Sequence, residues 1–181
     1  IDRDTIGALL AREPAVLRVL LRFLRDRLFE RLLRTSPLFQ PFTEGDRRHL
    51  ASRFRFLEVE PGAALVTQGK RATGLYVLMS GHARAIRVDP ATGIARELAV
   101  IGAGDLCGEM SLLTAEDAVA TVRTVGKLLA LELPAPAFRE VIMTHPQVLA
   151  YVAELAEHRR RLVDGTTAPA EEWSDGHLDL F

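Results

Sequence analysis

Two neighbouring stretches near the middle of the chain contain the residue types best suited to chemistry. The segment 108–111, Gly-Glu-Met-Ser, follows a glycine-rich turn and predicts a short helix with Glu109 in its first turn. The small and β-branched residues from Ala118 to Val122 predict a strand that follows the short helix. Free backbone N–H groups at a helix start favour a phosphate, and a fixed carboxylate can accept hydrogen bonds from a sugar hydroxyl. Together the two stretches predict a cradle for an anion and a sugar.

Helical periodicity dominates the N-terminal part of the chain. Leucines recur at three- and four-residue steps over Pro14–Arg34, which predicts an amphipathic helix that Ser36-Pro37 ends. We expect a shorter helix over Asp4–Arg12. Thr43 has the character of an N-cap for a further helix that ends near Arg53. We expect these helices to pack against the segment that follows them.

The pattern changes to short apolar runs between Phe56 and Glu132. Turns recur every 8 to 12 residues or so, which is typical of an antiparallel barrel or sandwich. Pro61-Gly62 predicts a type II turn, and the segment Asp89–Gly93 predicts a hairpin loop. We expect strands over residues 56–60, 65–67, 75–79, 98–101, 119–125 and 127–133.

Helical spacing returns after Pro134, with a break at His145-Pro146. In the last helix the apolar positions are Val148, Val152, Leu155 and Leu162. We assign the opposite, polar face to Glu154, Glu157, Arg159, Arg160 and Arg161. The polar residues 164–181 predict a C-terminal tail that is disordered or weakly docked.

Composition narrows the class of protein. The chain has 181 residues with 23 Lys and Arg against 24 Asp and Glu, so net charge gives no argument for nucleic acid. The single cysteine, Cys107, excludes a disulfide framework within these residues and favours a cytoplasmic setting. No apolar run approaches the roughly 20 residues of a membrane span. Because the chain starts at Ile1 rather than Met, we expect a fragment of a longer protein.

No constellation in the sequence predicts catalysis, and we expect no catalytic residues. There is no Ser–His–Asp set, no metal-ligand cluster and no phosphate loop with Lys and Ser or Thr. His82 invites a metal-binding reading, but position 84 is Arg, so we expect no metal site.

The ordered set of motifs resembles the cyclic nucleotide-binding domain, over about residues 38 to 162. The resemblance is carried by Gly108-Glu109-Met110-Ser111-Leu112-Leu113, Ala120-Thr121-Val122, Ser36-Pro37-Leu38-Phe39, Gln68-Gly69, Gly81 and Gly102-Ala103-Gly104-Asp105. It implies an α+β fold, an eight-strand antiparallel β-roll of the double-stranded β-helix or jelly-roll kind, flanked by N-terminal and C-terminal helices. We divide the chain into a helical segment 1–37, the β-roll with its flanking helices 38–163, and a tail 164–181.

The resemblance also implies the ligand-contacting positions. They are Gly108, Glu109, Met110, Ser111, Ala118, Val119, Ala120 and Thr121. In this family the glutamate takes the ribose 2′-hydroxyl and an arginine pairs with the cyclic phosphate. By position the glutamate is Glu109, and the arginine position holds Ala118.

The missing arginine decides the functional hypothesis. A charge-assisted hydrogen bond contributes on the order of 1.5–3 kcal/mol, so its loss weakens binding by roughly 10- to 150-fold. Glu116 and Asp117 add like charge beside the anion site. Strand alternation directs Arg123 to the other face. Replacement of the missing cation by Arg84, Arg87 or Arg96 stays open as an alternative.

We therefore expect a non-catalytic regulatory module with weak or lost cyclic nucleotide binding and an interaction or dimerisation role, for instance a homodimer through the long helices. The alternative is an active sensor of cAMP, cGMP or another small molecule that signals when the cradle closes and repacks the last helix. That helix could cover a ligand through Tyr151 or Val152, or dimerise. Only 18 residues follow Val163, too few for a helix-turn-helix DNA-binding domain within this chain.

Overall fold

The computed structural model describes residues 14–40 and 42–165. The expected helix over 4–12 and most of the expected tail lie outside these residues. The helices are α2 (Pro14–Thr35), α3 (Glu44–Ser52), α4 (Glu109–Thr114), α5 (Ala135–Thr144) and α6 (Pro146–Gly165). The strands are β1 (Arg55–Val59), β2 (Ala64–Val66), β3 (Gly74–Ser80), β4 (Ala83–Val88), β5 (Ala95–Ile101), β6 (Leu106–Cys107), β7 (Thr121–Thr124) and β8 (Leu128–Pro134).

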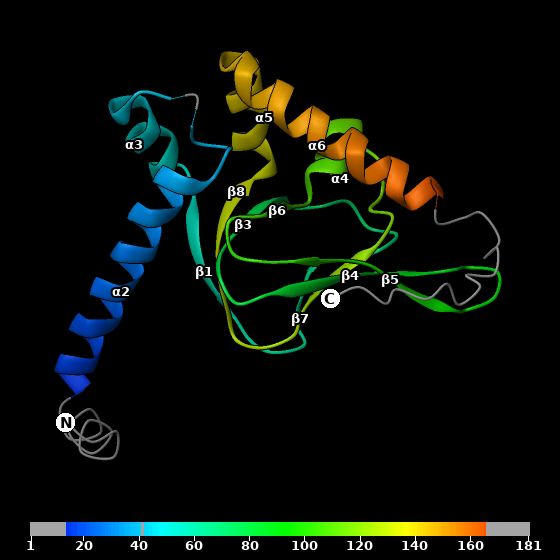
Figure 1. Ribbon diagram of the computed structural model, residues 1–181, viewed down its shortest axis with the longest axis horizontal. Coiled ribbons are helices and arrows are strands. Elements are labelled where there is room, and N and C mark those ends of the chain that lie inside the picture. Colours follow the sequence, from blue (N-terminus) through cyan, green and yellow to red (C-terminus); the bar gives the residue numbers. More distant parts are fainter. Residues whose placement is uncertain (1–13, 41, 166–181) are drawn as a thin grey trace, which may run out of the picture.

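The strands form two antiparallel four-stranded sheets, with the orders β1-β8-β3-β6 and β2-β7-β4-β5. Figure 1 shows these sheets as a roll with the helices gathered at one end and over one edge. This arrangement confirms the expected α+β fold and the antiparallel β-roll flanked by helices. Strand alternation explains how one roll supports two cores, because successive side chains of a strand point to opposite faces.

Strand β3 separates the two cores. Its residues 74–79 are all buried. Tyr76 and Leu78 face the roll interior, where they join residues from both sheets such as Val122. Leu75 and Val77 face the helices and pack in a second cluster. This double burial explains why β3 is continuously apolar in the sequence rather than alternating.

The second cluster fastens the helices to the roll. It combines Leu32 and Leu33 of α2 with Phe138 of α5 and Val152 of α6. An ion pair between Arg53, which follows α3, and Glu140 of α5 links α3 to α5 at the surface. The C-terminal end of α2 and the roll thus share one core, which positions α6 beside the short helix α4 (Figure 1).

Local signals in the sequence account for several element boundaries. The Thr43 hydroxyl caps α3 by accepting a hydrogen bond from the Asp46 amide at 3.3 Å, as expected. Gly62 has a φ of +79°, which a type II turn requires at its third residue. The Asp89 carboxylate accepts hydrogen bonds from the amides of Ala91 and Thr92 in the hairpin loop. The helix break at His145 is also confirmed, because α5 ends there and α6 begins at Pro146.

Strand β7 begins later than the sequence predicted. We expected the strand to start at Val119, but it starts at Thr121. Ala118, three positions before Thr121, forms hydrogen bonds with a turn instead. Its amide donates to the Lys70 carbonyl at 3.0 Å, and its carbonyl accepts from the Gly69 amide at 2.9 Å. The residues before Thr121 are therefore a loop that a turn holds in place.

Candidate ligand-binding site

The first wall of the site is the tight junction between β6 and α4. Gly108 caps α4 with a φ of +94°, in the left-handed region that favours glycine. A Cβ at this position would lie 2.5 Å from the Gly74 carbonyl oxygen, so the two backbones touch. The junction directs Glu109, at the first position of α4, into the protein, where its side chain is only 2% exposed.

The second wall is the loop 115–120, which is tied back to α4. The Ser111 hydroxyl donates to the Glu116 carbonyl at 2.5 Å and accepts from the Ala72 amide at 3.0 Å. Together with the two backbone bonds of Ala118, these contacts hold the loop at a fixed distance from α4.

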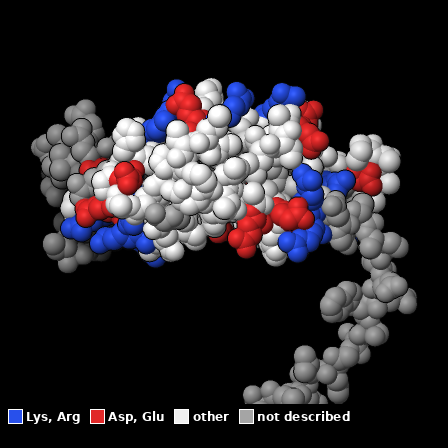
Figure 2. Space-filling view, turned by 90° about the horizontal axis from the view of Figure 1, so that it is seen from above, with Lys and Arg blue, Asp and Glu red and all other residues white. Residues whose placement is uncertain are grey.

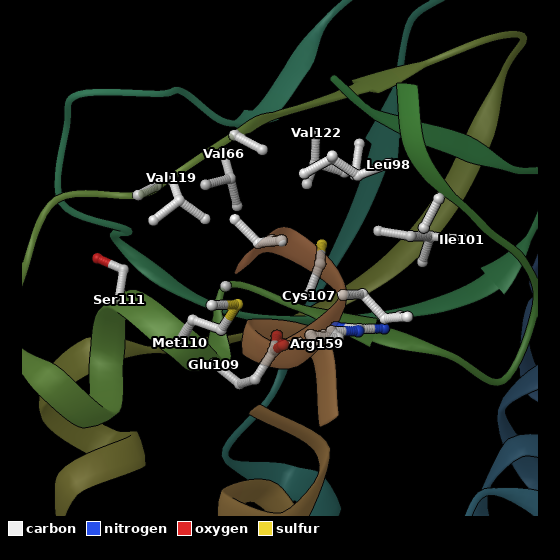
Figure 3. A pocket seen from close by; sticks show the side chains of 17 residues that line it. Val66, Leu98, Ile101, Cys107, Glu109, Met110, Ser111, Val119, Val122 and Arg159 are labelled. Atoms are coloured by element: carbon white, nitrogen blue, oxygen red, sulfur yellow. Dashed lines mark hydrogen bonds and ion pairs between the residues drawn. The ribbon is translucent and has the colours of Figure 1, made fainter. Parts of the chain in front are cut away.

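The two walls enclose a cavity of about 640 Å³, the opening to solvent included. Its other sides come from β2, β4, β5 and the end of α6. Figure 3 shows Glu109 and Arg159 at one end of the cavity, with Val66, Val119 and Val122 on the opposite side. The lining residues are Val66, Ala85, Leu98, Ala99, Ile101, Cys107, Gly108, Glu109, Met110, Ser111, Ala118, Val119, Ala120, Val122, Arg159, Leu162 and Val163.

The structure brings together most of the residues that the resemblance pointed to. Seven of them line the cavity: Gly108, Glu109, Met110, Ser111, Ala118, Val119 and Ala120. Thr121 is not among the lining residues, and its hydroxyl accepts a hydrogen bond from the Gln68 amide at 3.0 Å. Thr121 therefore holds the turn before Gly69 rather than facing the cavity.

The sequence comparisons identify the family to which this site belongs. Residues 56–145 match the model of the cyclic nucleotide-binding domain. These residues belong to that family. The cyclic nucleotide-binding domain thus contains both walls of the cavity, while the residues of α6 that line it lie beyond the matched range.

Curated relatives contain this domain within longer chains. The chain is 27% identical over 118 residues to the cAMP-dependent protein kinase regulatory subunit of Blastocladiella emersonii, covering 65% of this chain and 29% of that protein. It is 24% identical over 128 residues to lysophospholipase NTE1 of Coccidioides immitis, covering 70% of this chain and 8% of that protein. The chain thus spans less than a third of either relative.

Solved structures share the fold. The catabolite activator protein of Thermus thermophilus aligns with a TM-score of 0.64 and 30% identity, covering 72% of this chain and 61% of that one. The regulatory domain of Toxoplasma gondii PKA, crystallised with cAMP, aligns with a TM-score of 0.58 and 28% identity, covering 65% of this chain and 44% of that one.

A guanidinium that the sequence reading missed lies in the cavity wall of the cyclic nucleotide-binding domain. Arg159 of α6 donates from Nη1 to the Glu109 carboxylate at 2.7 Å and to the Leu106 carbonyl at 2.7 Å. Among the residues that the structure describes, Arg159 is the one basic residue lining the cavity. The carboxylate expected to take a ribose hydroxyl is therefore already bonded to a cation.

The assignment of Arg159 to the polar face of the last helix was wrong. Arg159 follows Leu155 by four residues and precedes Leu162 by three, so all three share a face of α6. This spacing is the signal that could have found it. The expectation that α6 covers a ligand through Tyr151 or Val152 was also wrong. Val152 is fully buried in the helical core, and the residues of α6 that line the cavity are Arg159, Leu162 and Val163.

The arginines considered as replacements lie elsewhere. Arg84 pairs with Glu97 at 3.5 Å on the surface, and Arg123 donates to the Gly62 carbonyl. Neither they nor Arg87 and Arg96 line the cavity. The expectation that Arg123 points away from the site is confirmed.

Two kinds of feature are absent from the described part of the chain. Residues 14–40 and 42–165 contain no cluster of three or more His, Cys, Asp or Glu side chains able to hold a metal ion. Over the same residues, no helix has both the length and the apolar character needed to cross a bilayer. Figure 2, which views the molecule from above Figure 1, shows acidic and basic side chains intermixed around an uncharged central area.

Cys107 makes the cavity wall sensitive to alkaline pH. Burial raises the pKa of its thiol far above the usual range, and Glu109 raises that pKa further while Arg159 lowers it. The unfolded chain ionises this thiol near pH 8.5. The buried thiol's contribution to stability is therefore complete below pH 8.5 and is lost as the pH rises above it.

We expect the unfolding free energy of the protein to fall by about 2 kcal/mol more between pH 8 and pH 10 than that of Cys107→Ala. Urea unfolding followed by far-UV circular dichroism at each pH measures the difference. The variant keeps the two tyrosines whose pKa values burial also raises, Tyr76 and Tyr151, so their contribution cancels. Parallel pH profiles for the two proteins would contradict the assignment.

Proposed function

We propose that this chain is a non-catalytic regulatory module in which cyclic nucleotides bind weakly or not at all. The proposal rests on the residues found at the phosphate-binding and ribose-binding positions, 118 and 109. By the resemblance Ala118 corresponds to the family's phosphate-binding arginine, and the structure has Glu109 held at 2.7 Å by Arg159. A cyclic nucleotide would lose its phosphate anchor, and its ribose would meet a carboxylate that is already bonded.

Two acidic residues of the second wall's loop oppose an anion further. Glu116 and Asp117 are exposed and directly precede Ala118 in the loop. Their negative charges repel a phosphate placed at the vacant arginine position. The regulatory role, through contacts of the helices with a partner or a second copy of the chain, and the cytoplasmic location remain predictions.

Titration calorimetry with cAMP and with cGMP tests this function. We expect no binding in the micromolar range for either nucleotide. Micromolar affinity for one of them would contradict the proposal. It would favour the alternative of an active cyclic nucleotide sensor, which is compatible with a cavity that is open to solvent.

A designed gain of binding tests the reason for the loss. The triple variant Ala118→Arg, Glu116→Gln, Asp117→Asn should bind cAMP at least about tenfold more tightly than the double variant Glu116→Gln, Asp117→Asn. The double variant is the matched control, because it removes the same rim charges without supplying a guanidinium. Equal affinities in calorimetry would show that the missing cation does not explain weak binding.

A further inference from the structure

The walls of the cavity are apolar on every side except one. Aliphatic side chains come from four strands, with Val66 on β2, Ala85 on β4, Leu98 and Ile101 on β5, and Val122 on β7. Leu162 and Val163 close the side formed by α6. An occupant of this space therefore contacts mainly aliphatic carbon, which favours apolar surface.

The polar side chains of the wall have partners within the protein. Glu109 and Arg159 bind each other at 2.7 Å, which neutralises both charges. The Ser111 hydroxyl donates to the Glu116 carbonyl and accepts from the Ala72 amide. A charged ligand would have to compete with the Glu109–Arg159 pair for a counter-ion, and burying an uncompensated charge is costly.

The exposed rim adds discrimination by charge. Glu116 and Asp117 lie at the start of the loop that forms the second wall, and both are exposed. They disfavour an anion near this loop while exerting no such repulsion on neutral molecules.

We propose that the cavity binds an uncharged, predominantly apolar small molecule. This inference rests on the proposed function, since it names the ligand class of the same site. The protein is a regulatory module whose ligand is recognised by apolar contact rather than by a phosphate.

A matched pair of fluorescent probes tests the ligand class on the full chain. N-phenyl-1-naphthylamine is neutral, and 8-anilino-1-naphthalenesulfonate has the same rings with one added sulfonate. We expect saturable binding of one neutral molecule per chain, at least about tenfold tighter than binding of the sulfonate. Equal or tighter binding of the sulfonate, or no saturable binding of the neutral probe, overturns the inference.

Two substitutions on one strand locate the bound probe. Ala99 lines the cavity, whereas Val100, the next residue on β5, is absent from the lining and 58% exposed. Ala99→Phe should weaken the neutral probe about tenfold, and Val100→Phe should leave it unchanged. Equal weakening by both variants would mean that the probe binds outside the cavity. Circular dichroism confirms that each variant is folded before it is titrated.

The same protein preparation separates this inference from the proposed function. Micromolar binding of cAMP or cGMP contradicts the function, whatever the probes do. Failure of the neutral probe in a protein that also binds no cyclic nucleotide overturns the ligand class alone.

Discussion

Replacing Arg159 by Met should lower the unfolding free energy by about 3 kcal/mol. The substitution leaves Glu109, only 2% exposed, without the guanidinium that now holds it at 2.7 Å. Breaking a buried pair by removing one partner costs roughly 3–5 kcal/mol, and the 23% exposure of the Arg159 side chain places the expected loss at the lower end. Urea unfolding followed by far-UV circular dichroism measures it.

Two further variants separate the ion pair from other properties of α6. Arg160→Met removes the same kind of side chain from the next, exposed position and should change the free energy by less than about 0.5 kcal/mol. The double variant Glu109→Leu, Arg159→Met removes both charges and should recover much of the loss, because no unpaired carboxylate remains. If Arg159→Met were no more costly than Arg160→Met, the pair would contribute nothing measurable to stability.

Gly108→Ala should destabilise the junction between β6 and α4. The new Cβ would lie 2.5 Å from the Gly74 carbonyl oxygen, and the backbone has a φ of +94°. Gly104→Ala is the matched control, since Gly104 has a φ of +96° but no heavy atom within 4 Å of the added Cβ. Both variants bear the cost of a side chain at positive φ, and only one bears the clash.

We expect Gly108→Ala to be less stable than Gly104→Ala by about 1–3 kcal/mol, the usual cost of overpacking. Thermal and urea unfolding of the two variants beside the unmodified protein measure this difference. Equal stabilities would show that the β6–α4 junction moves away from Gly74 at little cost. The close backbone approach described for the first wall would then have no energetic consequence.

Most of the roll could be predicted because its signals are local. Turn residues such as Gly62 and Asp89 specify their own backbone, and alternation along the strands specifies which face is buried. Glu109 could be located for the same reason, since the glycine before it and the helix after it are neighbours in the sequence. The first wall of the cavity thus follows from a short stretch of sequence.

The ion-pair partner of Glu109 could not be predicted in this way. Its partner Arg159 lies 50 residues further along the chain, and α6 reaches the cavity only because the helical core positions it there. Arg159 stands among three consecutive arginines, which conceal that one of them belongs to the apolar face. The late start of β7 escaped for a similar reason, because Ala118 bonds to a turn some 50 residues earlier.

Because Glu109 can bond either to Arg159 or to a ligand, the kind of ligand would decide how α6 responds. A ligand hydroxyl that took the Glu109 oxygen now bonded to Arg159 would release the guanidinium and weaken the contact of α6 with the cavity. A ligand that left the Glu109–Arg159 pair intact would instead hold α6 in place by packing against Leu162 and Val163. The hydrogen-bonding groups of the ligand, rather than its size, would decide whether α6 is released or held.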